Sequence, residues 1–194
     1  QAKPRERIDQ EEVSRILGVS RSPIREAVVV LAQEGLVRLS PNRGAFVADI
    51  TPADIAEHYE VFGVLSGRTA AQAAQLLTDD DLAELSAVHR SFETGDRMQM
   101  SLANHRFHQI INSVASRRTR WMLALLERSV PAHSYEFSDG LYANAIADHR
   151  AILDSLLARD GDAARWAMEH HLAEGGRAAT AALAARGFWK DTPK

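Results

Sequence analysis

Three of the eight histidines in this chain lie among aliphatic residues at helical spacing. His108 follows Asn104 by four positions, so both side chains share one face of a helix, and that face also carries Ile111. His149 and His171 stand in two later helical segments, each beside leucine or isoleucine. Three histidines that point inward from three helices could converge on one polar pocket and bind a metal through neutral imidazoles.

The alternative is that these histidines are packing residues. A histidine on an apolar face is more often a core residue with satisfied hydrogen bonds than a metal ligand, and the chain contains no HxxxH or HExxH pair. A structural role without metal therefore stays open. The other five histidines, at positions 58, 89, 105, 133 and 170, have less support and are interpreted as surface or core residues.

A second group of candidate residues is basic and lies near the N-terminus. Between positions 13 and 44 there are five arginines (15, 21, 25, 38 and 43) and two acids (Glu26 and Glu34), a local balance of +3. The whole chain has a formal net charge of -3, so the remainder carries -6. A basic head on an acidic body predicts that the two parts meet different partners.

The basic head has the pattern of a helix-turn-helix. Asp9 can cap a first helix that Gly18 ends, and Ser20 or Ser22 can cap a second helix with Pro23 in its first turn. The buried face of this second helix is predicted to contain Ile24, Ala27, Val28, Leu31 and Ala32. Two helices joined by a tight glycine-containing turn form a helix-turn-helix.

An apolar hairpin follows. Residues 36–39 and 45–48 are predicted strands, and residues 40–44 form the turn between them, as in a winged helix-turn-helix. The second helix can then present its first side chains to base edges in a major groove. Arg43 at the wing tip can reach a phosphate or a minor groove, and Gly44 lets the backbone approach closely. An isolated surface arginine is more often merely solvated, but here several converge on one edge.

The body is predicted to be wholly helical. A capping box at Thr51 begins the first of six helices, and Thr78 with three aspartates begins the second, which Gly95 ends. The remaining helices are expected at about 98–115, 119–130, 141–158 and 163–186, with Pro131 after the fourth. The fold class is therefore mainly α, a winged helix-turn-helix (1–50) followed by an all-α bundle (51–194).

Composition limits the location of the protein. The chain has no cysteine, no visible signal peptide, and no apolar run long enough to cross a membrane. We therefore expect a cytoplasmic protein with no membrane partner.

The head closely resembles a known family. The stretch VSRILGVSRSPIREAVVVLAQEGLVRLSPNRGAFV is similar to the winged helix-turn-helix of the GntR family of bacterial transcription regulators. The resemblance implies that the residues touching DNA are Arg21, Ser22, Arg25, Arg43 and Gly44. Glu11 stands where some members carry a DNA-contacting arginine and is left out. The first helix of the family would precede Arg5, so we expect further sequence upstream.

The body resembles the FCD effector domain of the FadR subfamily. The stretches EVFGVLSGRTAAQAA, ANHRFHQIINSVAS and ADHRAILDSLLARDGDAARWAMEHHL are similar to its three signatures, and six helices suit the VanR-like type. The resemblance implies a divalent metal (zinc, nickel or manganese) that helps to hold a small carboxylate effector. Its ligands would be Asn104, His108, His149 and His171, with His170 as a register alternative to His171.

Three positions depart from the FCD pattern. Asn104 replaces the usual aspartate, and a neutral amide oxygen is a weaker ligand than a carboxylate. Phe62 and Ser66 stand where an arginine and a glutamate are common. Without that arginine a bidentate clamp for a carboxylate is missing, so the usual organic-acid effector does not follow from the resemblance.

The sequence thus predicts a ligand-responsive transcriptional regulator, most often a repressor in this family, that binds palindromic operator DNA as a homodimer. It is not expected to be an enzyme. The alternative from another class is a helical metal-dependent enzyme in which a metal held by histidines activates water. Asp148 is the one acid considered as the general base of such an enzyme. As the residue before His149 on a helix, it is expected to point in a different direction from His149.

Overall fold

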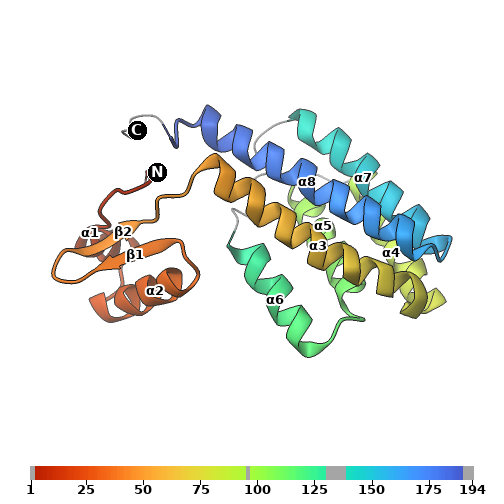
Figure 1. Ribbon diagram of the computed structural model, residues 1–194, viewed down its shortest axis with the longest axis horizontal. Coiled ribbons are helices and arrows are strands. Elements are labelled where there is room, and N and C mark those ends of the chain that lie inside the picture. The colour runs from red at the N-terminus through yellow and green to blue at the C-terminus, as the bar shows by residue number, and fades with distance from the viewer. Residues whose placement is uncertain (1–2, 95–96, 130–138, 190–194) are drawn as a thin grey trace. The chain divides into compact units, whose positions relative to one another are not determined.

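The computed structural model describes residues 3–94, 97–129 and 139–189 (Figure 1). The chain forms two compact units. The head unit contains residues 1–54 and 183–194, and the bundle unit contains residues 55–182. The boundary predicted at residue 50 lies four positions before the first division, whereas the return of the C-terminal segment to the head unit was not predicted. No helix in the described ranges is long and apolar enough to span a membrane.

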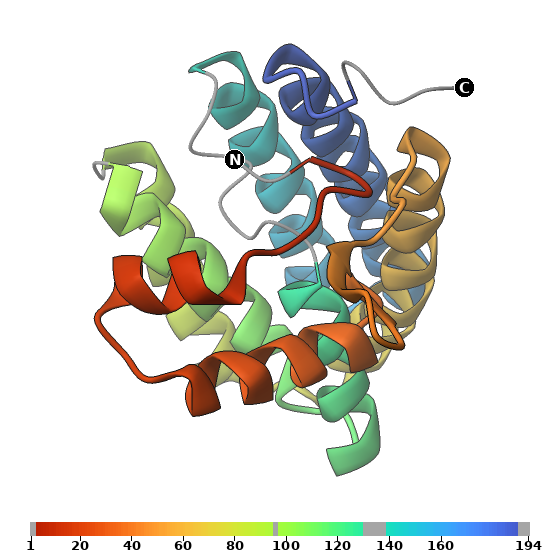
Figure 2. The same cartoon turned by 90° about the vertical axis from the view of Figure 1, so that its left-hand side faces the viewer.

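The helix-turn-helix is built from α1 (Gln10–Leu17) and α2 (Arg21–Gln33), which Figure 2 shows one above the other. Asp9 Oδ1 accepts the backbone N–H groups of Glu11 and Glu12 at 3.0 and 3.1 Å. Gly18 ends α1 with a φ of 66°, a left-handed conformation that glycine adopts without strain. The predicted cap and end of this helix are confirmed.

The core of the head unit is small and mostly local in sequence. The buried residues Ile24 and Val28 of α2 pack with Val37 and Ala45 of the hairpin, and partly buried aliphatic residues surround them. Ala27 was predicted to lie on the buried face of α2, and that prediction is wrong because its side chain is exposed. The buried stripe of α2 is narrower than the apolar run because this core has only a two-stranded sheet to cover one side of the helix.

The wing is an antiparallel hairpin of β1 (Val37–Ser40) and β2 (Gly44–Val47), in register from Val37↔Val47 to Ser40↔Gly44. The predicted strands are each displaced by one residue. The segment before α1 pairs with the free edge of β2: Arg5 N donates to Val47 O at 3.1 Å, and Ile8 N donates to Ala45 O at 2.9 Å. This extended segment was not predicted.

The end of the chain also belongs to the head unit. Trp189 Nε1 donates a hydrogen bond of 2.8 Å to the carbonyl of Ile50, in the segment that leads into the first long helix. Thr51 and Asp54 then form the predicted capping box, in which Asp54 N donates to Thr51 Oγ1 and Thr51 N donates to Asp54 Oδ2.

Within the residues that the structure describes, the bundle contains six helices, as predicted. They are α3 (Pro52–Leu76), α4 (Asp79–Thr94), α5 (Arg97–Asn112), α6 (Arg117–Arg128), α7 (Asp139–Leu157) and α8 (Gly161–Ala185). Their bounds lie within a few residues of the expected ones. The ends expected at Gly95 and at Val130 before Pro131 fall outside the described residues.

Helices α3 and α8 run side by side and approach closely at glycines. A Cβ atom added to Gly67 would lie 2.7 Å from Glu169 Cγ, and one added to Gly176 would lie 2.8 Å from Tyr59 Cβ. Larger residues at these positions would force the two helices apart. This close packing sets the depth at which α8 places its inward side chains.

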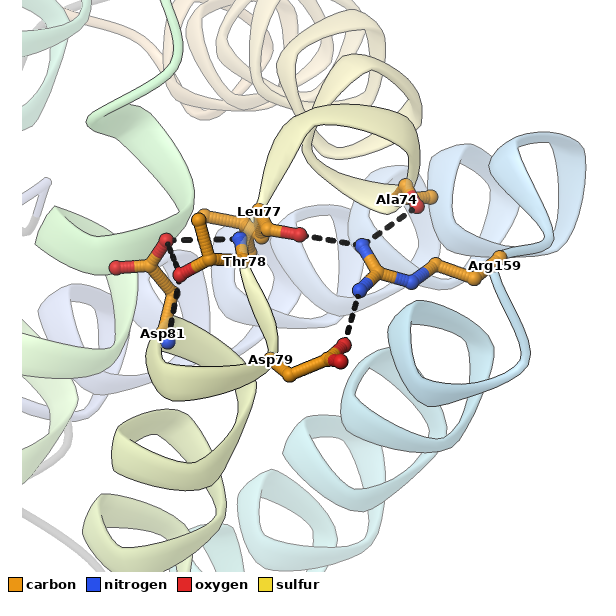
Figure 3. Close-up of polar contacts among 6 residues, drawn as sticks. All are labelled: Ala74, Leu77, Thr78, Asp79, Asp81 and Arg159. Atoms are coloured by element: carbon orange, nitrogen blue, oxygen red, sulfur yellow. Dashed lines mark hydrogen bonds and ion pairs between the residues drawn. The ribbon is translucent and has the colours of Figure 1, made fainter.

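The turn between α7 and α8 holds the junction of α3 and α4 (Figure 3). Arg159 donates to the carbonyls of Leu77 and Ala74 and pairs with Asp79 Oδ1 at 2.8 Å. Carbonyl groups at a helix end lack partners within the helix, so this guanidinium caps α3 from a distant part of the chain. Thr78 and Asp81 cap α4 beside it.

Candidate functional site

The bundle interior brings together three histidines from three helices. His108 of α5, His149 of α7 and His171 of α8 each offer a ring nitrogen, and these three atoms lie within 4.8 Å of one another. The ring centroids are 5.4 Å apart for His108 and His149, 5.4 Å for His108 and His171, and 4.4 Å for His149 and His171. The inward orientation predicted from helical periodicity is present for all three side chains.

Apolar packing surrounds this histidine cluster. His149 and His171 are each only 1% exposed. The ring of Phe92 stacks on His149 with centroids 4.6 Å apart, and Phe107 meets His149 edge-on at 4.8 Å. Such packing holds the His149 ring in place, while His108 stays partly exposed.

The ring nitrogens of the cluster are poorly satisfied. His149 Nδ1 donates to the carbonyl of Ala145 at 2.6 Å, which leaves Nε2 as the unprotonated nitrogen. That Nε2 and both nitrogens of His171 are buried without a hydrogen-bond partner among the described residues. Buried polar atoms in proteins nearly always have partners, and an unsatisfied one costs about 1–3 kcal/mol. The cluster therefore has the donor set that a cation would complete.

Asp148, the acid considered above as a general base, lies next to this cluster. Its Oδ2 atom is 3.5 Å from His171 Nδ1, without the alignment of a hydrogen bond. The Asp148 carboxylate faces His171 on α8, a contact that was not predicted. A carboxylate in this position can accept the Nδ1–H of a histidine whose Nε2 binds a metal.

Burial lowers the pKa of two histidines of the cluster, His108 and His149. Desolvation, with smaller contributions from His171 and His105, lowers the pKa of His108 to about 3. Desolvation also holds the pKa of His149 well below its usual value, and the nearby His171 and His108 add to this effect, while the Ala145 carbonyl opposes it. Neutral imidazole is the form that binds metals, so these residues need not lose a proton at neutral pH.

The remaining ligand candidates and one further histidine lie outside the group of three. Asn104 is partly exposed on α5, one helical turn before His108. His170 stacks on Trp166 with ring centroids 5.1 Å apart, so on α8 it is His171 and not its register alternative that lies in the cluster. His58 bonds the Leu126 carbonyl at 3.0 Å.

Three further histidines were predicted as surface or core. His89 is buried, and His105 lies 3.3 Å from Glu127 on the surface. His133 lies outside the described residues.

The residues predicted to touch DNA are exposed on the head unit. Arg21, Ser22 and Arg25 occupy the first turns of α2 and are exposed, whereas Ile24 and Val28 of the same helix are buried. Ser22 and Arg25 line a shallow hollow with Val29 and Gln33.

The first turn of α2 carries one notable ion pair. The guanidinium of Arg21 is paired with the carboxylate of Glu11 on α1. Glu11 is the residue that replaces an arginine of some family members, so its charge bears directly on a predicted DNA contact.

The tip of the wing has an unusual backbone. Arg43 and Gly44 are exposed, and the chain adopts positive φ angles at Asn42 (59°) and Gly44 (99°). Asn and Gly are the residues that tolerate this conformation best, which explains their place in the turn. The turn carries the Arg43 side chain at the end of the hairpin.

A winged helix-turn-helix followed by a bundle of six helices defines a class of DNA-binding transcriptional regulator. Residues 1–47 match the model for bacterial regulatory proteins of the gntR family, and residues 57–174 match the FCD domain. This chain belongs to the GntR family and carries an FCD domain.

Two relatives are named as repressors. The HTH-type transcriptional repressor RspR of Escherichia coli K12 is 29% identical over 174 residues, which cover 86% of this chain and 76% of that protein. A protein of Paenarthrobacter nicotinovorans named "Probable D-xylose utilization operon transcriptional repressor" is 29% identical over 167 residues, 84% of this chain and 74% of its own length. The chain is therefore a transcriptional regulator, which decides against the metal-dependent enzyme.

Solved structures support the fold. McbR/YncC of E. coli superposes with a TM-score of 0.67 at 23% identity, over 90% of this chain and 86% of that one. A GntR family member from Pseudomonas syringae pv. tomato gives a TM-score of 0.60 at 24% identity, over 92% of this chain and 78% of that one. At these identities the likeness concerns the fold alone.

Proposed function

We propose that this GntR-family regulator represses transcription by binding palindromic operator DNA as a homodimer, and that a divalent metal in its bundle helps to hold a small-molecule effector. The observation that carries the effector part is the set of three imidazoles whose ring nitrogens lie within 4.8 Å of one another, with unpartnered nitrogens on the buried His149 and His171. The names of two relatives favour repression over activation.

The DNA part of the proposal rests on the first turns of α2 and on the wing. Arg25 is exposed and free to form a bidentate contact with a guanine, the commonest specific arginine contact in a major groove. Arg21 and Ser22 lie where a helix meets the phosphate backbone, and Arg43 and Gly44 lie at the tip that approaches the neighbouring groove. A homodimer follows because two-fold symmetric half-sites call for a two-fold symmetric protein.

The metal part of the proposal rests on the chemistry of the donor set. His108, His149 and His171 would hold the metal, with the amide oxygen of Asn104 as a weaker fourth ligand. Three neutral imidazoles suit zinc or nickel well, and manganese less well because it prefers oxygen ligands. These ligands add no negative charge, so a bound metal would attract an anion at an open coordination position.

The effector chemistry follows from that charge. A small carboxylate would satisfy the metal, but Phe62 and Ser66 provide no arginine to clamp its second oxygen. We therefore assign the effector to small anions held mainly by the metal. Such an effector changes DNA affinity only if it binds two arrangements of the regulator with different free energies.

Two measurements test the proposal. Selection of duplex DNA from a random pool by the purified chain should yield a palindromic sequence, and sedimentation should give a dimer. A chain that selects no sequence would contradict the operator assignment, and one half-site bound by a monomer would contradict the homodimer.

The metal is tested by metal content and melting temperature with zinc, nickel or manganese added after chelation. Wild type should bind and melt higher with metal, because a ligand of the folded state stabilises by about 2.7 kcal/mol at a hundred times its dissociation constant. His149→Ala should lose both effects, and Asn104→Asp should bind more tightly. His170→Ala is the matched control on α8 and should behave as wild type. Four proteins that melt alike with and without metal would show that the cluster is only a packing feature.

A further inference from the structure

A row of three side chains crosses the exposed face of the wing. Phe46 of β2 is paired directly with Arg38 of β1 on one side and with Arg7 of the preceding segment on the other. Directly paired residues of antiparallel strands project from the same face of a sheet. The opposite face carries Val37 and Ala45, which are buried in the head core. The row Arg7–Phe46–Arg38 therefore faces away from that core.

Close contacts hold both arginines of this row in place. The guanidinium carbon of Arg38 lies 5.2 Å from the centroid of the Phe46 ring, within the range of a cation–π interaction. Arg7 covers Gly44: a Cβ atom at that glycine would lie 3.5 Å from Arg7 Nε and 3.8 Å from Arg7 Nη2. Gly44 adjoins Arg43, so the row is continuous with the predicted DNA-contacting tip of the wing.

The acids near this row are already engaged elsewhere. Asp9 and Glu11 line the same hollow as Arg7 and Gly44. Asp9 Oδ1 caps α1, and Glu11 is paired with Arg21.

The other basic residue of the extended segment differs from Arg7. Arg5 forms an ion pair with Asp49 at 2.5 Å. Among the residues that the structure describes, Arg7 and Arg38 form no ion pair with a carboxylate. Two guanidinium groups on one face, neither of which forms an ion pair with a carboxylate in the described residues, favour an anionic partner.

We propose that Arg7 and Arg38 bind backbone phosphates of the DNA beside the groove that the wing tip enters, which extends the DNA contacts beyond the five predicted residues. This inference rests on the proposed DNA-binding function. Phosphates are favoured over bases because a guanidinium held against the flat face of a sheet cannot reach deeply into a groove, whereas phosphates line its edge. Duplex DNA is the partner that the adjoining wing tip and the positive charge of the row both fit.

Phosphate contacts have a distinct signature in salt dependence. The logarithm of the binding constant falls with the logarithm of salt concentration by about 0.9 for each phosphate neutralised on B-form DNA. Loss of such a contact reduces that slope by about one and weakens binding similarly on all sequences. A contact to a base edge would instead weaken binding mainly on the operator.

The experiment measures this slope for the full chain. Binding of wild type, Arg7→Gln, Arg38→Gln and the double variant is followed from low to high salt on the selected operator and on a random duplex of equal length. Each single variant should reduce the slope by about 0.9, and the double variant by about twice that. Arg15→Gln is the matched control, because Arg15 is an exposed arginine of the head unit that is paired with Glu12. Circular dichroism melting establishes that each variant is folded.

The possible outcomes separate this inference from the function beneath it. Slopes equal to those of wild type and Arg15→Gln would overturn the phosphate contacts while leaving DNA binding intact. A loss confined to the operator would also overturn them, because it would mean base recognition. If wild type itself binds neither duplex, the proposed DNA function fails and this inference fails with it.

Discussion

The head and the bundle use basic side chains in opposite ways. In the head, arginines are exposed, charged at every pH, and either paired with single carboxylates or unpaired. In the bundle, His149 and His171 are buried with nitrogens that lack hydrogen-bond partners among the described residues, and desolvation lowers the pKa of His108 and His149. A ligand that binds the head therefore displaces water and salt ions from exposed arginines. A ligand that binds the bundle instead supplies a partner for buried histidine nitrogens that lack one.

This contrast separates binding from stability. Surface ion pairs contribute about 0–1 kcal/mol each, so changes at the head should alter DNA affinity and leave folding nearly unchanged. Buried polar groups are costly when unpaired, so changes at the histidine cluster should alter folding as well as ligand binding. The variants below test whether changes in the head alter DNA affinity alone and whether changes in the histidine cluster also alter stability.

Acid should destabilise the metal-free protein most strongly. The unfolded chain takes up protons near the ordinary histidine pKa of about 6.5, whereas folded His108 resists protonation down to about 3. The unfolded state then binds more protons in this window, so the free energy of unfolding falls as pH drops. His108 alone should lower the free energy of unfolding by about 2 to 3 kcal/mol between about pH 7.5 and 4.5. His149 should lower it further, because its pKa is also depressed in the folded state.

Urea unfolding after chelation, repeated across this pH range, measures that loss. His149→Gln should reduce the pH dependence, whereas His170→Gln, which changes the exposed neighbour on α8, should keep it. A pH dependence that is the same in all three proteins would mean that the cluster does not stay neutral in the folded state.

Removal of the Arg25 side chain should affect the head through recognition alone. An arginine paired with guanine contributes about 1–3 kcal/mol of discrimination, so Arg25→Ala should weaken operator binding by about 5- to 150-fold. Random DNA should lose far less affinity, and the melting temperature should stay near that of wild type. Fluorescence anisotropy on both duplexes measures this, and equal losses on the two would mean that Arg25 touches only phosphate.

Asp148→Asn should weaken metal binding without removing a ligand. The carboxylate near His171 Nδ1 can accept its proton and so orient Nε2 toward the metal. Loss of such a partner typically reduces metal affinity by about 10- to 100-fold. Calorimetry with zinc measures the affinity, and ¹⁵N spectra of His171 report its tautomer. Asp154→Asn, an exposed change on the same helix, is the control; unchanged affinity in Asp148→Asn would remove this role.

Glu11→Gln should produce the mildest change, a gain in DNA affinity. The substitution releases Arg21 from its ion pair and removes a negative charge beside the DNA-contacting surface. An exposed ion pair of this kind contributes about 0.2–1 kcal/mol, which corresponds to a tightening of up to about five-fold. Binding titrations at low salt detect it, with Glu12→Gln as the control because that acid pairs with Arg15. Weaker binding by Glu11→Gln would mean that the pair positions Arg21 for DNA.

Much of the fold could be predicted because its signals are local. Helical periodicity and capping residues such as Asp9, Thr51 and Thr78 lie within a few positions of what they determine. The same helical periodicity predicted that the side chains of the three clustered histidines face the bundle interior. Which residues touch across helices depends on packing that periodicity does not contain, so the approach of Asp148 to His171 could not be predicted.

The features of the head that escaped prediction have similar causes. The segment around Arg7 is too short and polar to show strand alternation, so its pairing with β2 left no pattern. Ala27 continues the apolar run of α2, and a small side chain gives little indication of where the buried stripe ends.

The bond between Trp189 and Ile50 has a consequence for the order in which the protein forms during synthesis. The core residues of the head, from Ile24 to Ala45, leave the ribosome early and can pack soon afterwards. The indole that bonds the Ile50 carbonyl arrives 139 positions later, after the last histidine of the cluster. Because chains fold from the N-terminus as they are made, this contact is among the last to close. A product cut short after α8 would keep the head core and all three clustered histidines and would lack the Trp189 indole that bonds Ile50.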